Sequence, residues 1–150
     1  MEVRVRAVAI TDEGRLVVIR RQKVGRPAYR VFPGGGVRLT DQDEVSALMR
    51  ELNEEISGEA TVHQPIYCTE RRSSSGELRR EIFYICRLLR FSLQGGSGPE
   101  WRHFDPDNRY IVESIGMDEA ALLGANLLPG ELVEILVAAS DPFDLPSIDA

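Results

Sequence analysis

The segment from Pro33 to Gly58 constrains this chain most, because it joins a run of glycines to a helix with one apolar and one acidic face. From residue 45 onward, apolar residues recur at spacings of three and four, which places them on one stripe of a helix that faces a core. Glutamates recur at the same spacings on a neighbouring face. The apolar residues are Val45, Leu48, Leu52 and Ile56, and the glutamates are Glu51, Glu54 and Glu55.

The three glutamates are the candidate ligands of a divalent cation. Like charges at these spacings repel one another by about 0.2–0.5 kcal/mol per pair, and the sole cation between residues 41 and 58 is Arg50. Arg50 lies one turn before Glu54, so we expect it to pair with Glu54 and to leave Glu51 and Glu55 free. Mg²⁺ and Mn²⁺ prefer oxygen ligands, and a carbonyl of the glycine run can complete the protein's share of the coordination. Phosphate oxygens suit the remaining positions, which predicts a diphosphate substrate.

At these residues the sequence resembles the Nudix hydrolases. Their signature reads glycine, five residues, glutamate, seven residues, and then arginine, glutamate, an aliphatic residue, any residue, two glutamates, any residue, glycine and an aliphatic residue. Residues 50–55, Arg-Glu-Leu-Asn-Glu-Glu, match the central part at every position. The chain departs from the signature in a loop that is one residue longer, in Gln42 at the first acidic position, and in Ser57 where glycine is expected. The candidate replacements for the first acid are Asp41, Asp43 and Glu44.

The resemblance implies an α/β protein, the Nudix α/β/α sandwich, in which the glycine loop and the catalytic helix lie against a mixed sheet. It implies hydrolysis of a diphosphate bond in a nucleoside diphosphate linked to another group, as in a nucleoside triphosphate, a nucleotide sugar or a dinucleoside polyphosphate. Glu54 and Glu55 would be metal ligands, Glu51 a ligand or the general base, and Arg50 the residue that orients the glutamates. The carbonyl of Gly35 would be a backbone ligand of Mg²⁺ or Mn²⁺.

Members of this family often take a further acid from a downstream loop as ligand or base. Glu100, in the long loop predicted over residues 92–108, is the candidate in this chain, with Glu113 as the second choice. His103 shares that loop and is a candidate substrate contact. The aromatic residues that could stack on a nucleotide base are Tyr29, Tyr110 and Trp101. The alternative is that they belong to the core, as aromatic residues near strands more often do.

A basic run precedes the glycines. Nearly all of its cations are arginines, whose planar fork binds phosphate oxygens in pairs. We therefore expect this run to contact the substrate, with a solvated loop as the alternative. The cations are Arg20, Arg21, Lys23, Arg26 and Arg30.

Composition excludes several other classes of protein. The 150 residues suit one domain, a Nudix-like domain over residues 1–150 with 141–150 as a flexible tail. A net charge of −6 argues against general binding to nucleic acid. No apolar run approaches the length of a membrane span, and the first ten residues alternate like a strand rather than a signal peptide, so we expect a cytoplasmic protein. Cys68 and Cys86 are expected to be reduced thiols, and the family resemblance makes a homodimer plausible.

The remaining patterns predict hairpins, strands and helices in a mixed order. A capping box at Thr40 predicts a helix start near Asp41, and the same helix is expected to run through Ser57 and to end at Gly58. The predicted strands cover residues 3–9, 16–19, 29–32, 60–70, 77–89 and 110–117, the predicted helices 118–123 and 130–139, and the predicted basic loop 20–28.

Two alternatives to the first reading of the function stay open. Gln42 and Ser57 are compatible with a catalytically weakened Nudix module that binds a nucleotide as a sensor, although such a module has no need of the intact acid trio. A house-cleaning enzyme against damaged nucleoside triphosphates differs from the first reading only in its substrate. No readable motif marks a pocket for the base.

Overall fold

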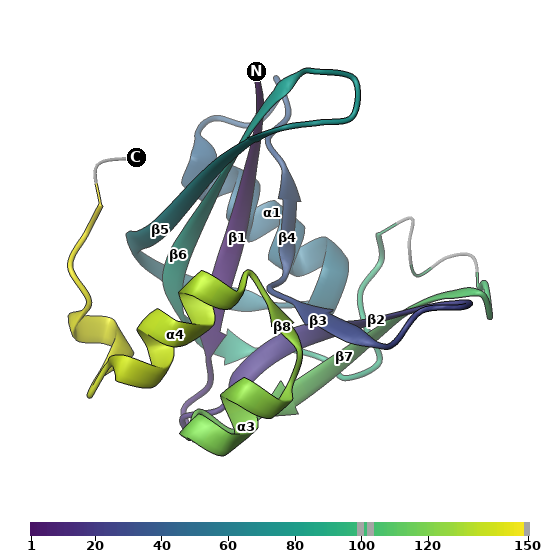
Figure 1. Cartoon of the computed structure of the whole chain (residues 1–150). Coiled ribbons are helices and arrows are strands. Elements are labelled where there is room, and N and C mark those ends of the chain that lie inside the picture. Colours follow the sequence, from purple (N-terminus) through teal and green to yellow (C-terminus); the bar gives the residue numbers. More distant parts are fainter. Residues whose placement is uncertain (99–100, 102–103, 149–150) are drawn as a thin grey trace.

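The computed structural model describes residues 1–98, 101 and 104–148, and it shows a mixed sheet with helices on both faces (Figure 1). The eight-stranded sheet has the order β5-β6-β1-β2-β3-β8, with β4 paired to β1 and β7 paired to β2. The strands are β1 (Glu2–Ile10), β2 (Leu16–Lys23), β3 (Tyr29–Val31), β4 (Gly34–Gly36), β5 (Glu59–Arg72), β6 (Leu78–Arg90), β7 (Asn108–Ile115) and β8 (Leu127–Leu128). The helical elements are α1 (Glu44–Ile56), α3 (Glu119–Gly124), α4 (Gly130–Ala138) and the short 3-10 turn η1 (Pro142–Asp144).

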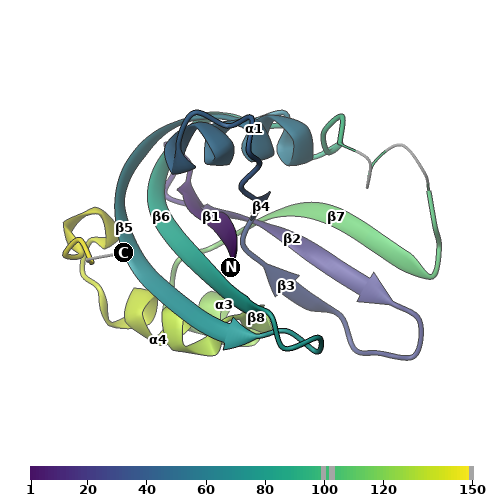
Figure 2. The ribbon, with the colours of Figure 1, turned by 90° about the horizontal axis from the view of Figure 1, so that it is seen from above.

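The sheet contains both parallel and antiparallel pairs. β1 runs parallel to β6 along its whole length, and β3 runs parallel to β8, whereas the other pairs are antiparallel. The helix α1 covers one face, and α3 and α4 cover the other (Figure 2). The predicted α/β/α sandwich with a mixed sheet is therefore confirmed.

Alternation along β1 and β2 explains why the sheet carries two cores. Successive side chains of a strand point to opposite faces, so Val5 and Ala7 pack with α1 while Val8 packs with α3 and α4. The apolar stripe of α1 closes the first core, and full burial of each large aliphatic side chain contributes about 1.5–3 kcal/mol. The fully buried residues of this stripe are Leu48, Leu52 and Ile56.

β1 and β2 stay paired only at one corner of the sheet. Their register joins Ala9 to Val17 and Ile10 to Leu16, and beyond this corner β1 takes β4 as its partner on that side while β2 takes β3. The two halves of the sheet consequently diverge, as Figure 2 shows for the β5-β6-β1 and β7-β2-β3 groups.

The structure corrects two local predictions before α1. Residues 20–23 continue β2 instead of forming a loop, because all four pair with β7, and Arg20 and Arg21 also pair with β3. The helix starts at Glu44, not near Asp41, because the side chain of Asp43 accepts a hydrogen bond from Ser46 N at 2.7 Å and acts as the N-cap.

The predicted end of α1 is also wrong. Ser57 itself adopts the left-handed conformation, with φ 51° and ψ 40°, whereas Gly58 follows it outside the region of positive φ. Ser57 N donates to Asn53 O and Gly58 N donates to Leu52 O, so the last carbonyls of the helix are satisfied by the two residues after it.

Residues 141–148 lie against β5. Gln64 Nε2 donates hydrogen bonds to the carbonyls of Phe143 at 3.0 Å and Leu145 at 2.8 Å, and Ile148 N donates to Pro65 O. Cys68 and Cys86 are free thiols, as predicted. None of the described helices combines the length and the apolar character needed to cross a bilayer.

Candidate active site

The glycine strand β4 brings two elements unusually close together. It pairs antiparallel with β1, with Val5 opposite Gly35. A Cβ on Gly34 would lie 2.0 Å from the carbonyl oxygen of Val5, and a Cβ on Gly35 would lie 2.6 Å from the carboxylate of Glu51. Only glycine permits both approaches, so the glycine run positions the sheet and α1 against each other.

The glutamates of α1 face this glycine strand. Glu51 is 9% exposed, and burial raises the pKa of its carboxyl group above the usual value. Glu55 Oε2 accepts a hydrogen bond of 3.5 Å from Gly34 N, and Glu54 lies one turn after Arg50. Of the predicted ligand residues, Gly35, Glu51 and Glu55 therefore line one cleft, and Glu54 is joined to Glu51 through Arg50.

Arg50 is the centre of a hydrogen-bond network in this site. Its guanidinium donates to Glu54 at 3.3 Å, as predicted, but it also donates to Glu51 at 3.0 Å, so the expectation that Glu51 is left free is wrong. It further donates to the Gly36 carbonyl at 3.0 Å and to both oxygens of Asp41 at 2.8 and 2.9 Å. One arginine thus orients two helix carboxylates and ties the preceding loop to the helix.

Asp41 is the acid near the Gln42 position that joins this network. Its side chain is 7% exposed, and the hydrogen bonds from Arg50, with a further one from Arg38 N, lower the pKa of its carboxyl group to about 2. Asp43 caps the helix instead. Glu44 accepts a hydrogen bond from the Tyr84 hydroxyl at 2.9 Å. Neither Asp43 nor Glu44 therefore contributes to the acid cluster, that is, to Glu51, Glu54 and Glu55.

The donor set fits a hard divalent cation in its chemistry. Within the described ranges, no three acidic, histidine or cysteine side chains already surround one point, and both Glu51 and Glu54 are engaged by Arg50. The Glu51 carboxylate lies beside Gly35, whose backbone carries no side chain to screen it. Carboxylates together with a backbone carbonyl are the ligands that Mg²⁺ and Mn²⁺ take in proteins.

A cleft of about 530 Å³ opens from this acidic cluster. Glu51, Glu55 and Gly35 form one end of its lining. Another part of the lining comes from the β2, β3 and β7 half of the sheet, where the Arg21 guanidinium lies 3.7 Å from the centroid of the Tyr110 ring and donates to Asn108. The other residues of this wall are Ile19, Tyr29 and Val31.

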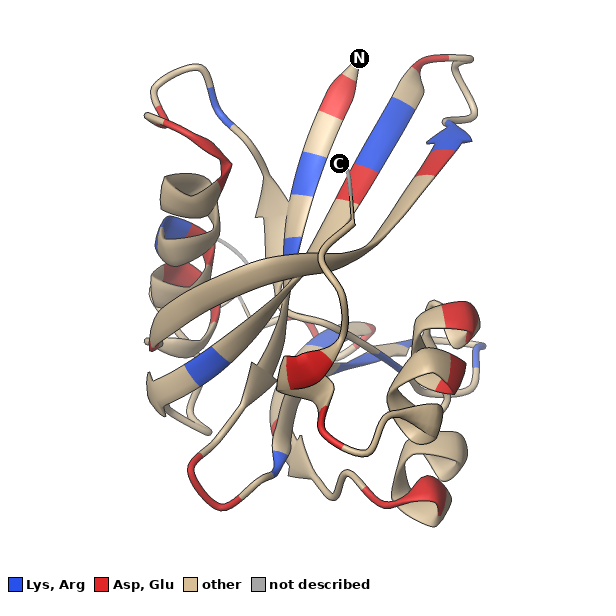
Figure 3. Cartoon of the chain, turned by 90° about the vertical axis from the view of Figure 1, so that its left-hand side faces the viewer, with Lys and Arg blue, Asp and Glu red and all other residues tan. Residues whose placement is uncertain are grey.

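The opposite lining is a basic wall made of Arg4, Arg6, Arg71 and Arg79, from β1, β5 and β6. Figure 3 shows the basic segments of these neighbouring strands side by side. Sequence reasoning missed the basic wall, because Arg4 and Arg6 alternate with apolar residues, and Arg71 and Arg79 stand in charged segments beside a turn, both of which look like solvated strand surface. The available signal was the pairing of two such segments across the predicted hairpin turn at residues 73–76.

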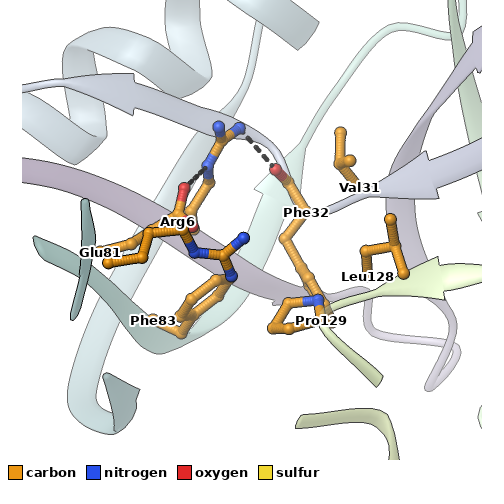
Figure 4. A pocket seen from close by; sticks show the side chains of 8 residues that line it. Arg6, Val31, Phe32, Glu81, Phe83, Leu128 and Pro129 are labelled. Carbon is orange, nitrogen blue, oxygen red and sulfur yellow. Dashed lines mark hydrogen bonds and ion pairs between the residues drawn. The ribbon is translucent and has the colours of Figure 1, made fainter. Parts of the chain in front are cut away.

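Arg6 links the basic wall to the glycine strand. It donates to Glu81 at 2.8 Å, to the carbonyl of Phe32 at 3.1 Å and to that of Gly34 at 3.3 Å. Figure 4 shows Arg6 between Glu81 and Phe32 at the edge of a smaller hollow of about 130 Å³, which shares Arg6, Glu81 and Arg71 with the main cleft. Arg6 is therefore held in place between the acid cluster and the rest of the basic wall.

The structure divides the basic run of residues 20–30. Arg21 lines the cleft, whereas Arg20 and Arg30, which are paired neighbours pointing to the other face, contact Glu113 at 3.5 and 2.6 Å. Lys23 lies 6.0 Å from the Tyr29 ring, and Arg26 is an exposed turn residue. The strand period of two separates these cations, because the segment is a strand and not a loop.

The remaining candidates fall in different places. Glu113 is engaged on the face opposite the cleft, while Glu100 and His103 lie outside the described residues. Tyr29 and Tyr110 line the cleft. Trp101 packs behind Tyr110, with ring centroids 6.1 Å apart, and does not line the cleft.

The fold and the site define an α/β protein in which an acidic helix meets an arginine-lined cleft, an arrangement suited to a phosphorylated ligand. A model of the NUDIX domain matches residues 1–112. The chain therefore belongs to the Nudix family and is a Nudix-type pyrophosphohydrolase, an enzyme that acts on phosphoanhydride bonds. Members of this family generally use divalent metal ions and act on small, nucleotide-like substrates.

Solved structures share the fold. The E. coli ORF135 protein is 25% identical and has a TM-score of 0.64, with 96% of this chain and 95% of that chain covered. The MutT protein from Methanosarcina mazei Go1 is 16% identical with a TM-score of 0.62, and the match covers 90% and 89% of the two chains. A MutT NUDIX hydrolase from Burkholderia pseudomallei is 20% identical with a TM-score of 0.54, over 77% and 83%. No protein of curated function matches the chain.

Proposed function

We propose that this enzyme cleaves a diphosphate bond in a nucleoside diphosphate linked to another group, with Mg²⁺ or Mn²⁺ held by Glu51, Glu54, Glu55 and the carbonyl of Gly35. One observation carries the proposal. The carboxylate of Glu51 is held against Gly35 at the end of a cleft whose walls carry arginines. Acids for a cation and cations for phosphates therefore line one and the same cleft.

The side chains divide the work of binding and orientation. When bound, the metal ion neutralises phosphate charge and lowers the pKa of a water molecule. Arg50 holds Glu51 and Glu54 in place through its hydrogen bonds. Arg6 and Arg21 reach the cleft from its two walls, where a guanidinium binds phosphate oxygens in pairs. Glu51, half enclosed by the glycine strand, serves as a ligand or as the base that takes the proton from the attacking water.

Metal binding is tested by titrating Mn²⁺ calorimetrically into the double variant Glu54→Gln, Glu55→Gln. We expect an affinity at least tenfold below that of the parent, because two charged oxygen ligands become neutral amides. The matched control is Glu119→Gln, Glu134→Gln, which removes the same charge from α3 and α4. Equal Mn²⁺ affinity in the parent and the first variant would place the metal site elsewhere.

Activity is tested with Mg²⁺ on nucleoside triphosphates, nucleotide sugars and dinucleoside polyphosphates, by release of phosphate, pyrophosphate or nucleotide. We expect turnover of at least one of these classes and a loss of at least a hundredfold in the double variant of the glutamates. Tight nucleotide binding without any turnover would contradict the proposal and favour the sensor reading.

A further inference from the structure

The basic wall is built from cross-strand rows on the β5-β6-β1 part of the sheet. Arg71 of β5 lies directly opposite Arg79 of β6, and Arg79 in turn lies beside Glu2 of β1. In the next row, Glu81 lies beside Arg4. These side chains share one face, because they are separated by two residues along each strand.

The charges of these rows do not balance. Glu2 accepts from both Arg4 at 2.8 Å and Arg79 at 3.1 Å, and Glu81 accepts from Arg6 at 2.8 Å. Arg71 pairs with no carboxylate in the part of the chain that the structure describes. Four cations therefore face two acids, in a protein whose net charge is −6.

The Arg71 and Arg79 pair costs stability as it stands. Like charges directly opposite one another on paired strands are destabilising. A carboxylate in place of either arginine would remove that cost. Neighbouring positions on the other face follow the opposite rule, since Glu70 lies across from Arg80. An anionic ligand between Arg71 and Arg79 would turn the repulsion into a bidentate site.

The basic wall starts next to the acid cluster and leads away from it. Arg6 touches the Gly34 carbonyl. Arg4 and Glu81 come from the next positions along the strands and Arg79 and Arg71 from the furthest, and Arg71 also borders the smaller hollow beside Arg6. The tyrosines Tyr29 and Tyr110 belong to the opposite wall. A substrate whose reacting phosphate is at the acid cluster can thus place its nucleoside on the tyrosine wall and further phosphates on the basic wall.

We infer that Arg71 and Arg79 bind phosphate groups on the far side of the cleaved bond, so that the substrate is a nucleoside polyphosphate and not a nucleoside diphosphate joined to an uncharged sugar. This inference rests on the proposed function. The α1 residues alone leave the substrate class open, because the acid cluster recognises the diphosphate that all the candidate substrates share. Arg71 and Arg79 select the nucleoside polyphosphates among these candidates.

The kinetic test uses pairs of substrates with a common base, ATP with ADP-ribose and UTP with UDP-glucose. In the double variant Arg71→Gln, Arg79→Gln we expect kcat/KM for the triphosphate to fall at least tenfold, mainly through KM, and that for the sugar to change less than threefold. The matched control is Arg72→Gln, Arg80→Gln. It removes the same charge from the next residue of each strand, whose side chain points to the other face, and it should leave kcat/KM for both substrates unchanged. An equal loss for both substrates of a pair overturns the inference.

A binding test separates this inference from the proposed function. Inorganic tripolyphosphate is titrated calorimetrically in the presence of EDTA, so that neither a metal nor turnover is needed. We expect the Arg71→Gln, Arg79→Gln variant to bind at least tenfold more weakly than the parent and the Arg72→Gln, Arg80→Gln variant to bind as the parent does. The melting temperature of the Arg71→Gln, Arg79→Gln variant should equal or exceed that of the parent, because the repulsion is gone and Glu2 keeps Arg4 as its partner. Unchanged tripolyphosphate affinity overturns the inference even if the enzyme hydrolyses every substrate, whereas absent hydrolysis with retained, arginine-dependent binding overturns the proposed function alone.

Discussion

Gly35 leaves room for the side chain of Glu51, because glycine has no side chain of its own. The carboxylate of Glu51 occupies the space that any Cβ at residue 35 would need. The glycine next to it, Gly36, has no heavy atom within 4 Å of its Cβ position. These two neighbouring glycines therefore differ, because a side chain at Gly35 would collide with Glu51 whereas one at Gly36 would meet open space.

We predict that Gly35→Ala lowers kcat/KM at least tenfold, equivalent to about 1.4 kcal/mol in the barrier. The added methyl group displaces the flexible Glu51 side chain, so the fold survives while the acid cluster loses its geometry. The control is Gly36→Ala, which should keep kcat/KM within twofold. Steady-state kinetics and thermal melting of both variants check this, and equal losses in both would show that contact with Glu51 is not the cause.

The Asp41 and Arg50 pair predicts a pH dependence of stability. The folded-state pKa of Asp41, about 2, lies below its ordinary value of 3.8 because of the hydrogen bonds from Arg50. A carboxyl group with a lowered pKa stabilises the fold above its ordinary pKa, and this contribution is lost as the pH falls toward the folded-state pKa.

We therefore predict that Asp41→Asn melts at a lower temperature than the parent at pH 7, and that the difference shrinks as the pH falls from about 4 toward about 2. Melting curves over this range measure the effect. Asp12→Asn, in the exposed turn after β1, is the control. A difference that stays constant down to pH 2 would contradict the role of the Arg50 contact.

The end of α1 is held by segments far away in the chain. Ser92 N donates to the Ile56 carbonyl and Gly98 N donates to that of Glu54, both at 2.8 Å. Ser57 Oγ donates to Gly95 O at 3.1 Å. This last contact stabilises a residue whose left-handed backbone is costly for any side chain other than glycine, by roughly 1 kcal/mol.

We predict that Ser57→Ala lowers the free energy of unfolding by about 1 kcal/mol, because the Gly95 hydrogen bond is lost and the strain stays. Ser57→Gly loses the same hydrogen bond but relieves the strain, so its stability should lie within about 1 kcal/mol of the parent and above that of Ser57→Ala. Turnover should stay within threefold in both, since the glutamates lie before this turn. Urea denaturation distinguishes the variants, and equal stability of the alanine and glycine forms would argue against strain at this residue.

The sheet sends the neighbouring arginines of residues 20–30 to opposite faces, where they belong to two separate groups of charged residues. Arg21 points into the cleft, whereas Arg20 and Arg30 share Glu113 on the face covered by α3 and α4. Arg30 also donates to the Ala125 carbonyl at 2.8 Å. This second cluster ties β2, β3 and β7 to the residues after α3.

We predict that Glu113→Gln lowers the free energy of unfolding by about 1–2 kcal/mol, because two half-buried arginines lose their shared carboxylate. The value of kcat should stay within twofold, because Glu113 lies away from the cleft. Chemical denaturation and steady-state kinetics of this variant, with the exposed Glu119→Gln as control, give both quantities. A hundredfold loss of kcat with unchanged stability would restore Glu113 as a candidate base.

Local patterns were sufficient for most of the longer elements and for the spacing of the glutamates, but not for the ends of α1, the full length of β2 or the short strands β4 and β8. Glu51, Glu54 and Glu55 share a helix face because the helical period is a property of the backbone, and the alternating strands follow from the strand period in the same way. The glycine run at residues 34–36 predicted a close approach, which the structure shows at Gly34 and Gly35. The Arg50 to Glu54 contact followed from a spacing of four residues.

Contacts between distant segments decided the rest. The left-handed conformation of Ser57 depends on Gly95, and the burial of Glu51 depends on where β4 pairs with β1. Which arginines reach the cleft depends on strand register, because a shift of one residue sends a side chain to the other face. The predicted hairpin accounts for the pairing of Arg71 with Arg79, but the alignment of β1 beside β6, which completes the basic wall, joins segments far apart in the sequence and leaves no local mark in the chain.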